Sequence, residues 1–302
     1  MNSHYPRLPL DVCPADMEIL RSHQSITVAG RISSSEKGWT MPVRGARIEG
    51  EVEVNHGVMT RALIAAADRF AVACDLTAAH LWSMVVPSGF GLDVDAQACA
   101  VATIPDGNRL QSRGVRGRRL ELPHDHVTRL DGIPITTPAR TWLDCAALVR
   151  WTDTVAMGDA LLRSGLTDSA ELATVIAWGK GRRGVRSARW AHPLLDPNAE
   201  SPAESWARAI LIHGGLPAPV CNPPIRIFGR TFRLDLAWIR EKVAVEYDGV
   251  EFHGPEQAAH DERRRDLLRR AGWVILVIRR EDLASPGATI DTVHRLLRER
   301  QA

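Results

Sequence analysis

The stretch that decides the fold of the C-terminal third is RLDLAWIREKVAVEYDGVEFH, residues 233–253. Two short apolar runs, at residues 232–239 and 243–247, flank a polar turn. Because side chains alternate between the two faces of a strand, this pattern predicts a β-hairpin. Its first strand is expected to place four apolar side chains on one face: Phe232, Leu234, Leu236 and Trp238.

The polar face of this hairpin is predicted to gather three carboxylates, which are Asp235, Glu246 and Asp248. Close carboxylates repel one another, so such a cluster is costly unless a cation or a shared proton relieves the repulsion. A couple of carboxylates is also the ligand set that Mg²⁺ favours in proteins, with water and substrate oxygens completing its shell. The hairpin therefore predicts a cation site.

Length and composition bound the class of protein. The chain has 302 residues, enough for two domains, and its 45% hydrophobic and 25% charged residues are typical of a soluble globular protein. A net charge of +2 is too small to indicate a nucleic-acid-binding protein, so that function depends on local basic patches. The five cysteines lack disulfide or zinc-binding spacing, and we find no signal pattern and no membrane-spanning run. We expect a cytoplasmic protein without a membrane partner.

Proline-rich sequence marks the expected domain boundary. The segment PLLDPNAESP, residues 193–202, is polar and cannot continue a helix or strand. The sequence therefore predicts three parts: a poorly defined N-terminal lobe at residues 1–58, a mixed α+β domain at residues 59–192 and a C-terminal domain at residues 193–302. No function is assigned to the first part.

Two basic stretches, residues 109–119 and 179–189, combine arginines with glycines. Both fit a solvated arm or linker that needs no partner. Both also fit contacts with the phosphates of DNA, because arginines on a flexible loop suit backbone binding. Under the second interpretation the nucleic-acid-binding residues are Arg113, Arg116, Arg118, Arg119, Lys180, Arg182 and Arg183.

The C-terminal domain is predicted to open with a helix at residues 202–213. Ser201 takes the N-cap position, Pro202 the first helical position, and Glu204 follows three residues after the cap, which makes a capping box. This box is a complete structural explanation of Glu204, and a functional role competes with it. The segments that follow predict the element order α-β-β-β-α-β-α, an α/β layer fold.

The middle of the chain carries an ordered set of motifs. An apolar strand at residues 98–104 is followed by the turn PDG, then by RGVR and DGIPITTPARTWLD. Over residues 62–172 this order resembles the antitoxin of an abortive-infection toxin–antitoxin pair. The winged helix that precedes the segment in such antitoxins is not recognisable here. The resemblance implies a regulator with a protein partner or a homo-oligomeric state.

Four features of the C-terminal domain also occur in a characteristic order. They are Glu204 twelve residues before Leu216, Asp235 twelve residues before Tyr247, Asp248-Gly249 followed by His253, and the run AGWVILVI at residues 271–278. Over residues 199–283 this order resembles the PD-(D/E)XK nuclease superfamily, and within it the very-short-patch repair endonucleases. The resemblance implies a restriction-endonuclease-like fold.

The same resemblance implies metal-dependent cutting or nicking of DNA in repair or defence. It places Mg²⁺ or Mn²⁺ on the carboxylates of Asp235 and Glu246 and on the backbone carbonyl of Tyr247. The catalytic residues under this hypothesis are Asp235, Glu246, Asp248, His253 and Glu204.

Two positions depart from the nuclease pattern. Leu234 stands where a proline precedes the aspartate, and Asp248 stands where the lysine of the D/E-X-K triplet is expected. In the superfamily that lysine helps to orient or deprotonate the attacking water. Two functions therefore remain open: a metal-dependent DNA endonuclease, and a catalytically inactive nuclease-fold protein that acts as a nucleic-acid- or partner-binding regulator of the toxin–antitoxin type.

Overall fold

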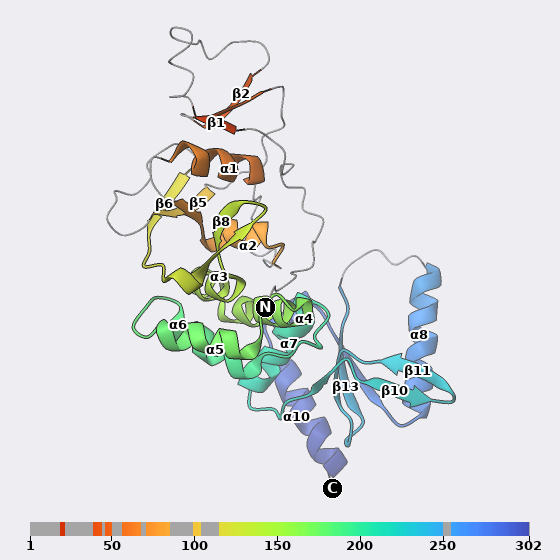
Figure 1. Cartoon of the computed structure of the whole chain (residues 1–302). Coiled ribbons are helices and arrows are strands. Elements are labelled where there is room, and N and C mark those ends of the chain that lie inside the picture. The colour runs from red at the N-terminus through yellow and green to blue at the C-terminus, as the bar shows by residue number, and fades with distance from the viewer. Residues whose placement is uncertain are drawn as a thin grey trace. The chain divides into compact units, whose positions relative to one another are not determined.

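The computed structural model divides into two compact units (Figure 1). The first unit joins Met1–Val149 with Gly165–Ala188, and the second joins Arg150–Ser164 with Arg189–Ala302. Within them the structure describes residues 19–21, 39–43, 46–49, 56–67, 71–84, 99–103, 115–249 and 255–301. The predicted ranges 1–58, 59–192 and 193–302 stay a prediction.

The first unit begins with a small antiparallel sheet of order β1-β3-β2. Its strands are β1 (Ile19–Arg21), β2 (Trp39–Val43) and β3 (Ala46–Glu49). Helix α1 (His56–Ala66) follows it. Ala62 and Leu63 of this helix pack on Ala71, at the start of the next sheet, so α1 contributes to the core of that sheet.

A five-stranded mixed sheet of order β6-β5-β4-β8-β7 forms the centre of the first unit. Its strands are β4 (Ala71–Ala73), β5 (Cys99–Thr103), β6 (Val115–Arg119), β7 (Val127–Leu130) and β8 (Ile133–Thr136). Strands β7 and β8 form a tight hairpin, because Asp131 and Gly132 both adopt positive φ angles, 47° and 79°. An Asp-Gly pair is the sequence that such a two-residue turn favours.

Short helices complete this unit. They are α2 (Asp75–Leu81), α3 (Pro138–Cys145), α5 (Ser169–Trp178), α6 (Val185–Ala191) and the 3₁₀ helix η4 (His124–His126); α6 runs on into the second unit. The start of α3 is set by the sequence: Thr137 Oγ1 accepts the backbone N–H of Arg140, and Pro138 occupies the first turn.

The second unit is built on a four-stranded sheet of order β14-β13-β12-β9. Its strands are β9 (Val220–Cys221), β12 (Leu236–Trp238), β13 (Val243–Tyr247) and β14 (Val274–Ile278). The pairs β9–β12 and β12–β13 are antiparallel, whereas β13 and β14 are parallel. A separate hairpin consists of β10 (Pro224–Ile227) and β11 (Arg230–Arg233).

The helices of this unit are α4 (Trp151–Ser164), η5 (His192–Leu194), α7 (Pro202–His213), α8 (Pro255–Arg270), α9 (Arg280–Ala284) and α10 (Gly287–Gln301). Of these, α7, α8 and α10 pack against the sheet, whereas α4 packs on α7. Leu211 of α7 and Leu297 of α10 share a core with Leu236 on one side, and Leu268 of α8 packs with Ala244 on the other. Helices α8 and α10 therefore lie on opposite sides of the sheet (Figure 1). The architecture is mixed α/β, as predicted at that level.

The predicted first strand, residues 232–239, is interrupted in the structure. Strand β11 ends at Arg233 and pairs with β10, and β12 starts at Leu236 and pairs with β13. As a result Leu234 packs with Ala237 on the α8 side rather than with Leu236. The expectation that Leu234 shares a face with Leu236 and Trp238 is therefore wrong, because the break shifts the alternation by one residue.

No helix among the described residues is long and apolar enough to cross a membrane.

Candidate functional site

The ends of β12 and β13 bring two of the predicted carboxylates together. Leu236 pairs with Val245, so Asp235 and Glu246 are neighbours across the antiparallel strands. Glu204 reaches the same place from the first turn of α7. The pKa of Asp235 is raised to about 6, first by burial and then by the negative charges of Glu204 and Glu246. These three carboxylates are called the carboxylate cluster below.

The backbone of β13 also contributes to the carboxylate cluster. The Tyr247 N–H donates to Asp235 Oδ2 at 2.9 Å, and this bond partly offsets the rise in the pKa of Asp235. A main-chain donor favours the ionised form of an aspartate, whereas burial and like charges favour the protonated form. At Asp235 the second influence is larger, so this carboxyl binds a proton more tightly than an ordinary aspartate does.

Glu246 is neutralised by two arginines from α8. Its side chain is 7% exposed, and Arg264 Nη1 lies 2.6 Å from Oε1 while Arg265 Nε lies 3.5 Å from Oε2. A buried carboxylate needs such partners because its charge loses the stabilisation of water. The sequence pattern missed this arrangement, since it gave no indication which arginines of α8 turn toward the sheet.

Glu204 holds α7 in place. Its backbone N–H donates to Ser201 Oγ at 3.2 Å, which confirms the predicted N-cap. The reciprocal bond of the predicted capping box goes to a different residue: Glu204 Oε2 accepts the N–H of Glu200 at 2.8 Å, not that of Ser201. The same oxygen accepts Asn222 Nδ2 at 2.6 Å. Glu204 Oε2 therefore accepts two hydrogen bonds from within the protein.

The remaining predicted catalytic residues lie elsewhere or outside the described residues. Asp248 is partly exposed, and its Oδ2 lies 3.8 Å from Arg279 Nη2, just beyond β14. Its backbone N–H donates to the Ile278 carbonyl at 2.9 Å. His253 lies in the segment 250–254, which the structure does not describe.

The carboxylate cluster fits a cation only in part. Asp235 and Glu246 offer the oxygen ligands that Mg²⁺ prefers. In the arrangement described, however, the guanidinium groups of Arg264 and Arg265 already supply the positive charge at Glu246. Across the part of the chain that the structure describes, no group of three or more His, Cys, Asp or Glu residues is arranged to hold a metal ion. The geometry therefore fits an arginine-neutralised cluster better than a metal centre.

A second buried charge pair stands in the same unit. Asp159 of α4 and Arg208 of α7 are both buried and form an ion pair. Asp159 Oδ1 also accepts the backbone N–H of Asp196 at 2.8 Å, and the Ser205 hydroxyl adds a further bond. Burial raises the pKa of Asp159, and Arg208 opposes that rise. This pair joins two helices, and the charge of each partner faces the opposite charge of the other, although Arg208 Nε has no hydrogen-bond partner among the described residues.

In the first unit the predicted nucleic-acid-binding arginines have mixed surroundings. Arg118 Nε lies 3.1 Å from Oδ2 of the fully buried Asp75, and Arg182 Nη2 lies 2.5 Å from Glu121 Oε2. The guanidinium of Arg182 also lies 4.1 Å from the centre of the Trp178 ring. These two side chains thus have partners within the protein.

The other members of that set are placed as follows. Arg119, Lys180 and Arg183 are exposed, Arg116 is half-buried, and Arg113 lies outside the described residues. Burial raises the pKa of Asp75, and the positive charges of Arg118 and then Arg116 oppose that rise. Asp75 was not predicted as a charged core residue, because its partners come from distant segments. Phosphate binding by this set stays a prediction.

Comparison with known proteins gives a partial match. Residues 71–196 match the family described as the AbiEi antitoxin C-terminal domain. Uncharacterised proteins from two strains of Mycobacterium tuberculosis are each 36% identical over 174 residues. The aligned region covers 57% of this chain and 64% of each relative. No solved structure matches the chain.

Proposed function

We propose that this protein is a regulator of the toxin–antitoxin type, in which the antitoxin-like region binds a partner protein. The observation that carries the proposal is the match of residues 71–196 to the AbiEi antitoxin C-terminal domain. In this proposal the second unit keeps a nuclease-like arrangement of strands and helices without cutting DNA. A fold alone does not establish catalysis.

The surroundings of Glu246 support a non-catalytic second unit. Phosphodiester hydrolysis needs a positive charge that stabilises the negative charge developing on the phosphoryl group in the transition state. At Glu246 the nearest positive charges are Arg264 and Arg265, and both are engaged with the carboxylate itself. The position after Tyr247, where a catalytic lysine is expected, holds Asp248.

The test is a growth-rescue experiment. The protein encoded beside this chain in its genome is expressed alone and then together with the full chain. We expect growth to stop in the first case and recover in the second, and the two purified proteins to elute as one complex. Asp235→Asn serves as the control and should rescue as well as the wild type. Loss of rescue in that variant would mean that the carboxylate cluster acts in the function, against the proposal.

The second candidate is a metal-dependent DNA endonuclease. The observation that favours it is the adjacency of Asp235 and Glu246 beside the Tyr247 backbone, in the order that resembles the PD-(D/E)XK superfamily. Under this alternative the protein nicks plasmid DNA in Mg²⁺ or Mn²⁺, and Asp235→Asn abolishes the nicking. Plasmid that stays intact with both metals, on matched and mismatched duplexes, supports the regulator instead.

A further inference from the structure

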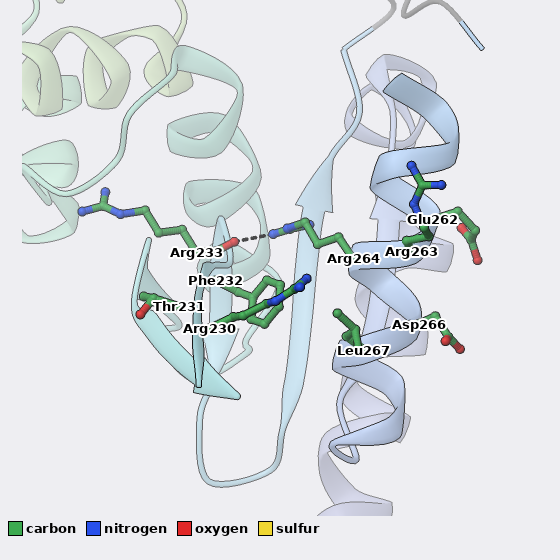
Figure 2. A pocket seen from close by; sticks show the side chains of 9 residues that line it. All are labelled: Arg230, Thr231, Phe232, Arg233, Glu262, Arg263, Arg264, Asp266 and Leu267. Carbon is green, nitrogen blue, oxygen red and sulfur yellow. Dashed lines mark hydrogen bonds between the residues drawn. The ribbon is translucent and has the colours of Figure 1, made fainter. Parts of the chain in front are cut away.

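A groove of about 1110 Å³ opens between β11 and α8 in the second unit (Figure 2). Four arginines line it: Arg230 and Arg233 on β11, and Arg263 and Arg264 on α8. Phe232 and Leu267 add apolar surface. The groove lies outside the antitoxin-like region, and Arg264 is the lining residue that also contacts the carboxylate cluster.

Two of the four arginines are already engaged. Arg233 forms an ion pair with Glu200, and Arg264 binds both Glu246 and the backbone carbonyl of Arg233. Within the described residues, Arg230 and Arg263 have neither an ion pair nor a side-chain hydrogen bond. Among the described residues, no ion pair compensates these two guanidinium groups of the groove.

The acidic residues of the groove do not cancel this charge. Glu262 pairs with Arg269 at 2.7 Å, and Asp266 pairs with Arg270 at 2.9 Å. Figure 2 shows Glu262 and Asp266 on the side of α8 that is turned away from β11. A ligand in the groove thus meets mainly positive charge, and the site selects an anion.

The aromatic ring narrows the class of anion. Phe232 is half-buried, and Figure 2 shows its side chain between the hairpin and α8. Guanidinium groups beside an aromatic side chain are what proteins use to hold a nucleic-acid strand, with phosphates on the cations and a base on the ring. A base in a duplex stacks on its neighbours, so only an unpaired base can reach such a ring.

We propose that this groove binds a single strand of nucleic acid, with phosphates at Arg230 and Arg263 and one base against Phe232. An acidic peptide would match the charge but offers no flat base to the ring. The proposal stands apart from the proposed toxin–antitoxin function, since it uses neither the partner protein nor the carboxylate cluster.

The experiment measures fluorescence anisotropy of the full chain with short labelled oligonucleotides. Single-stranded DNA, single-stranded RNA and a DNA duplex of the same sequence are compared across a salt series. We expect a single strand to bind more tightly than the duplex, and the DNA and RNA arms identify which strand is preferred. The proposal is overturned if the duplex binds as tightly as the single-stranded DNA and the single-stranded RNA. It is also overturned if neither single strand binds.

The variant Arg230→Gln/Arg263→Gln tests the cations. We expect this variant to bind about tenfold more weakly, or weaker still. The slope of the logarithm of the binding constant against the logarithm of the salt concentration should become smaller by about 1.4, because each phosphate contact of a single strand contributes about 0.7 to that slope. The control Arg295→Gln/Arg298→Gln removes the same charge from α10 and should leave affinity nearly unchanged. Equal losses in the two variants mean non-specific charge and overturn the proposal.

The variant Phe232→Leu tests the ring. Leucine keeps apolar contact with the core beneath the hairpin, whereas it cannot stack with a base. We expect affinity for the single strand to fall about fivefold or more, because stacking on an aromatic side chain contributes at least that factor. An unchanged affinity in a variant with a wild-type melting temperature contradicts the placement of a base at Phe232.

Discussion

Asp159, which is buried, and Asp235, which is half-buried, are two aspartates of the second unit in opposite surroundings. Burial raises the pKa of both. Asp159 faces the guanidinium of Arg208, a backbone N–H and a hydroxyl, so its charge is met on several sides. At Asp235 the described residues supply one N–H donor, that of Tyr247, and two carboxylates among its other charged neighbours.

The difference teaches that burial of a carboxylate does not mark a functional site by itself. A buried ion pair that satisfies both partners fixes a structure, and removing one partner is costly. A buried carboxylate beside like charges is instead a destabilising feature that the rest of the fold tolerates. Asp159 has the first arrangement, and Asp235 has the second.

The largest expected effect comes from Arg208→Met. This change keeps most of the side-chain volume but leaves the Asp159 carboxylate buried without its cation. We expect the free energy of unfolding to fall by about 3–5 kcal/mol, measured by urea denaturation of the full chain. The exposed variant Arg295→Gln is the control and should change it by less than about 0.5 kcal/mol. If Arg208→Met lowers the free energy of unfolding as little as the control does, then Arg208 does not stabilise the Asp159 carboxylate, and the two aspartates do not differ in this respect.

The second-largest expected effect is a gain in the free energy of unfolding, in Asp235→Asn. Asp235 has a folded pKa of about 6, above the ordinary value of 3.8, so the folded state binds its proton more tightly than the unfolded state. The wild type therefore loses stability as pH rises from about 4 to about 6. We expect Asp235→Asn to be more stable than the wild type by about 1–3 kcal/mol at pH 8.

This gain should shrink as pH falls through the same window, because the wild-type carboxyl then becomes neutral in the folded state. Urea midpoints of both proteins at several pH values measure the difference. A gain that is independent of pH would show that the charge of Asp235 is not its cause.

A smaller effect is expected at the start of α7, the helix that carries both Glu204 and Arg208. Ser201→Ala removes the hydroxyl that accepts the Glu204 N–H. We expect a loss of about 1 kcal/mol, whereas Ser201→Gly should cost only a few tenths. Equal losses for the two changes would show that the hydroxyl is not what stabilises the helix start.

The smallest effect concerns Mg²⁺. Arg264→Gln/Arg265→Gln removes the guanidinium groups from Glu246 and leaves the carboxylate cluster without its internal cations. We expect Mg²⁺ to raise the melting temperature of this variant but not that of the wild type. When the Mg²⁺ concentration equals the Kd, the free energy of unfolding of the variant should rise by about 0.4 kcal/mol.

Adding Asp235→Asn to this variant should remove the response to Mg²⁺. A wild type that is already stabilised by Mg²⁺, with loss of that response in Asp235→Asn alone, would show that a cation binds while the arginines are present. That outcome would favour the endonuclease over the regulator.

Local sequence patterns explain part of this structure. Alternation along the hairpin accounts for the position of Asp235 beside Glu246, and the Thr137 and Ser201 caps follow from side chains within three residues. The break at Leu234 could not be read locally. Both faces of β12 are buried, so apolar residues occupy both sides and the alternation that marks a face is lost.

Charge pairs were the least predictable part of the fold. Arg264 is one of three consecutive arginines, and its contact with Glu246 depends on the rotation of α8 over the sheet. The Arg118–Asp75 pair likewise joins residues far apart in the sequence. Periodicity identifies which residues share a face of one element, but not which residue of another element meets them.

Arg264 belongs to two surroundings at once, since its guanidinium binds Glu246 and its side chain also lines the groove beside β11. If the proposed anion in the groove draws this guanidinium away, Glu246 is left with less positive charge and would bind a cation more tightly. Thermodynamic linkage would make the relation reciprocal, so a cation at Glu246 would strengthen anion binding in the groove by the same factor. Under that proposal, a single arginine would couple the occupancy of two places that lie on different elements of the unit.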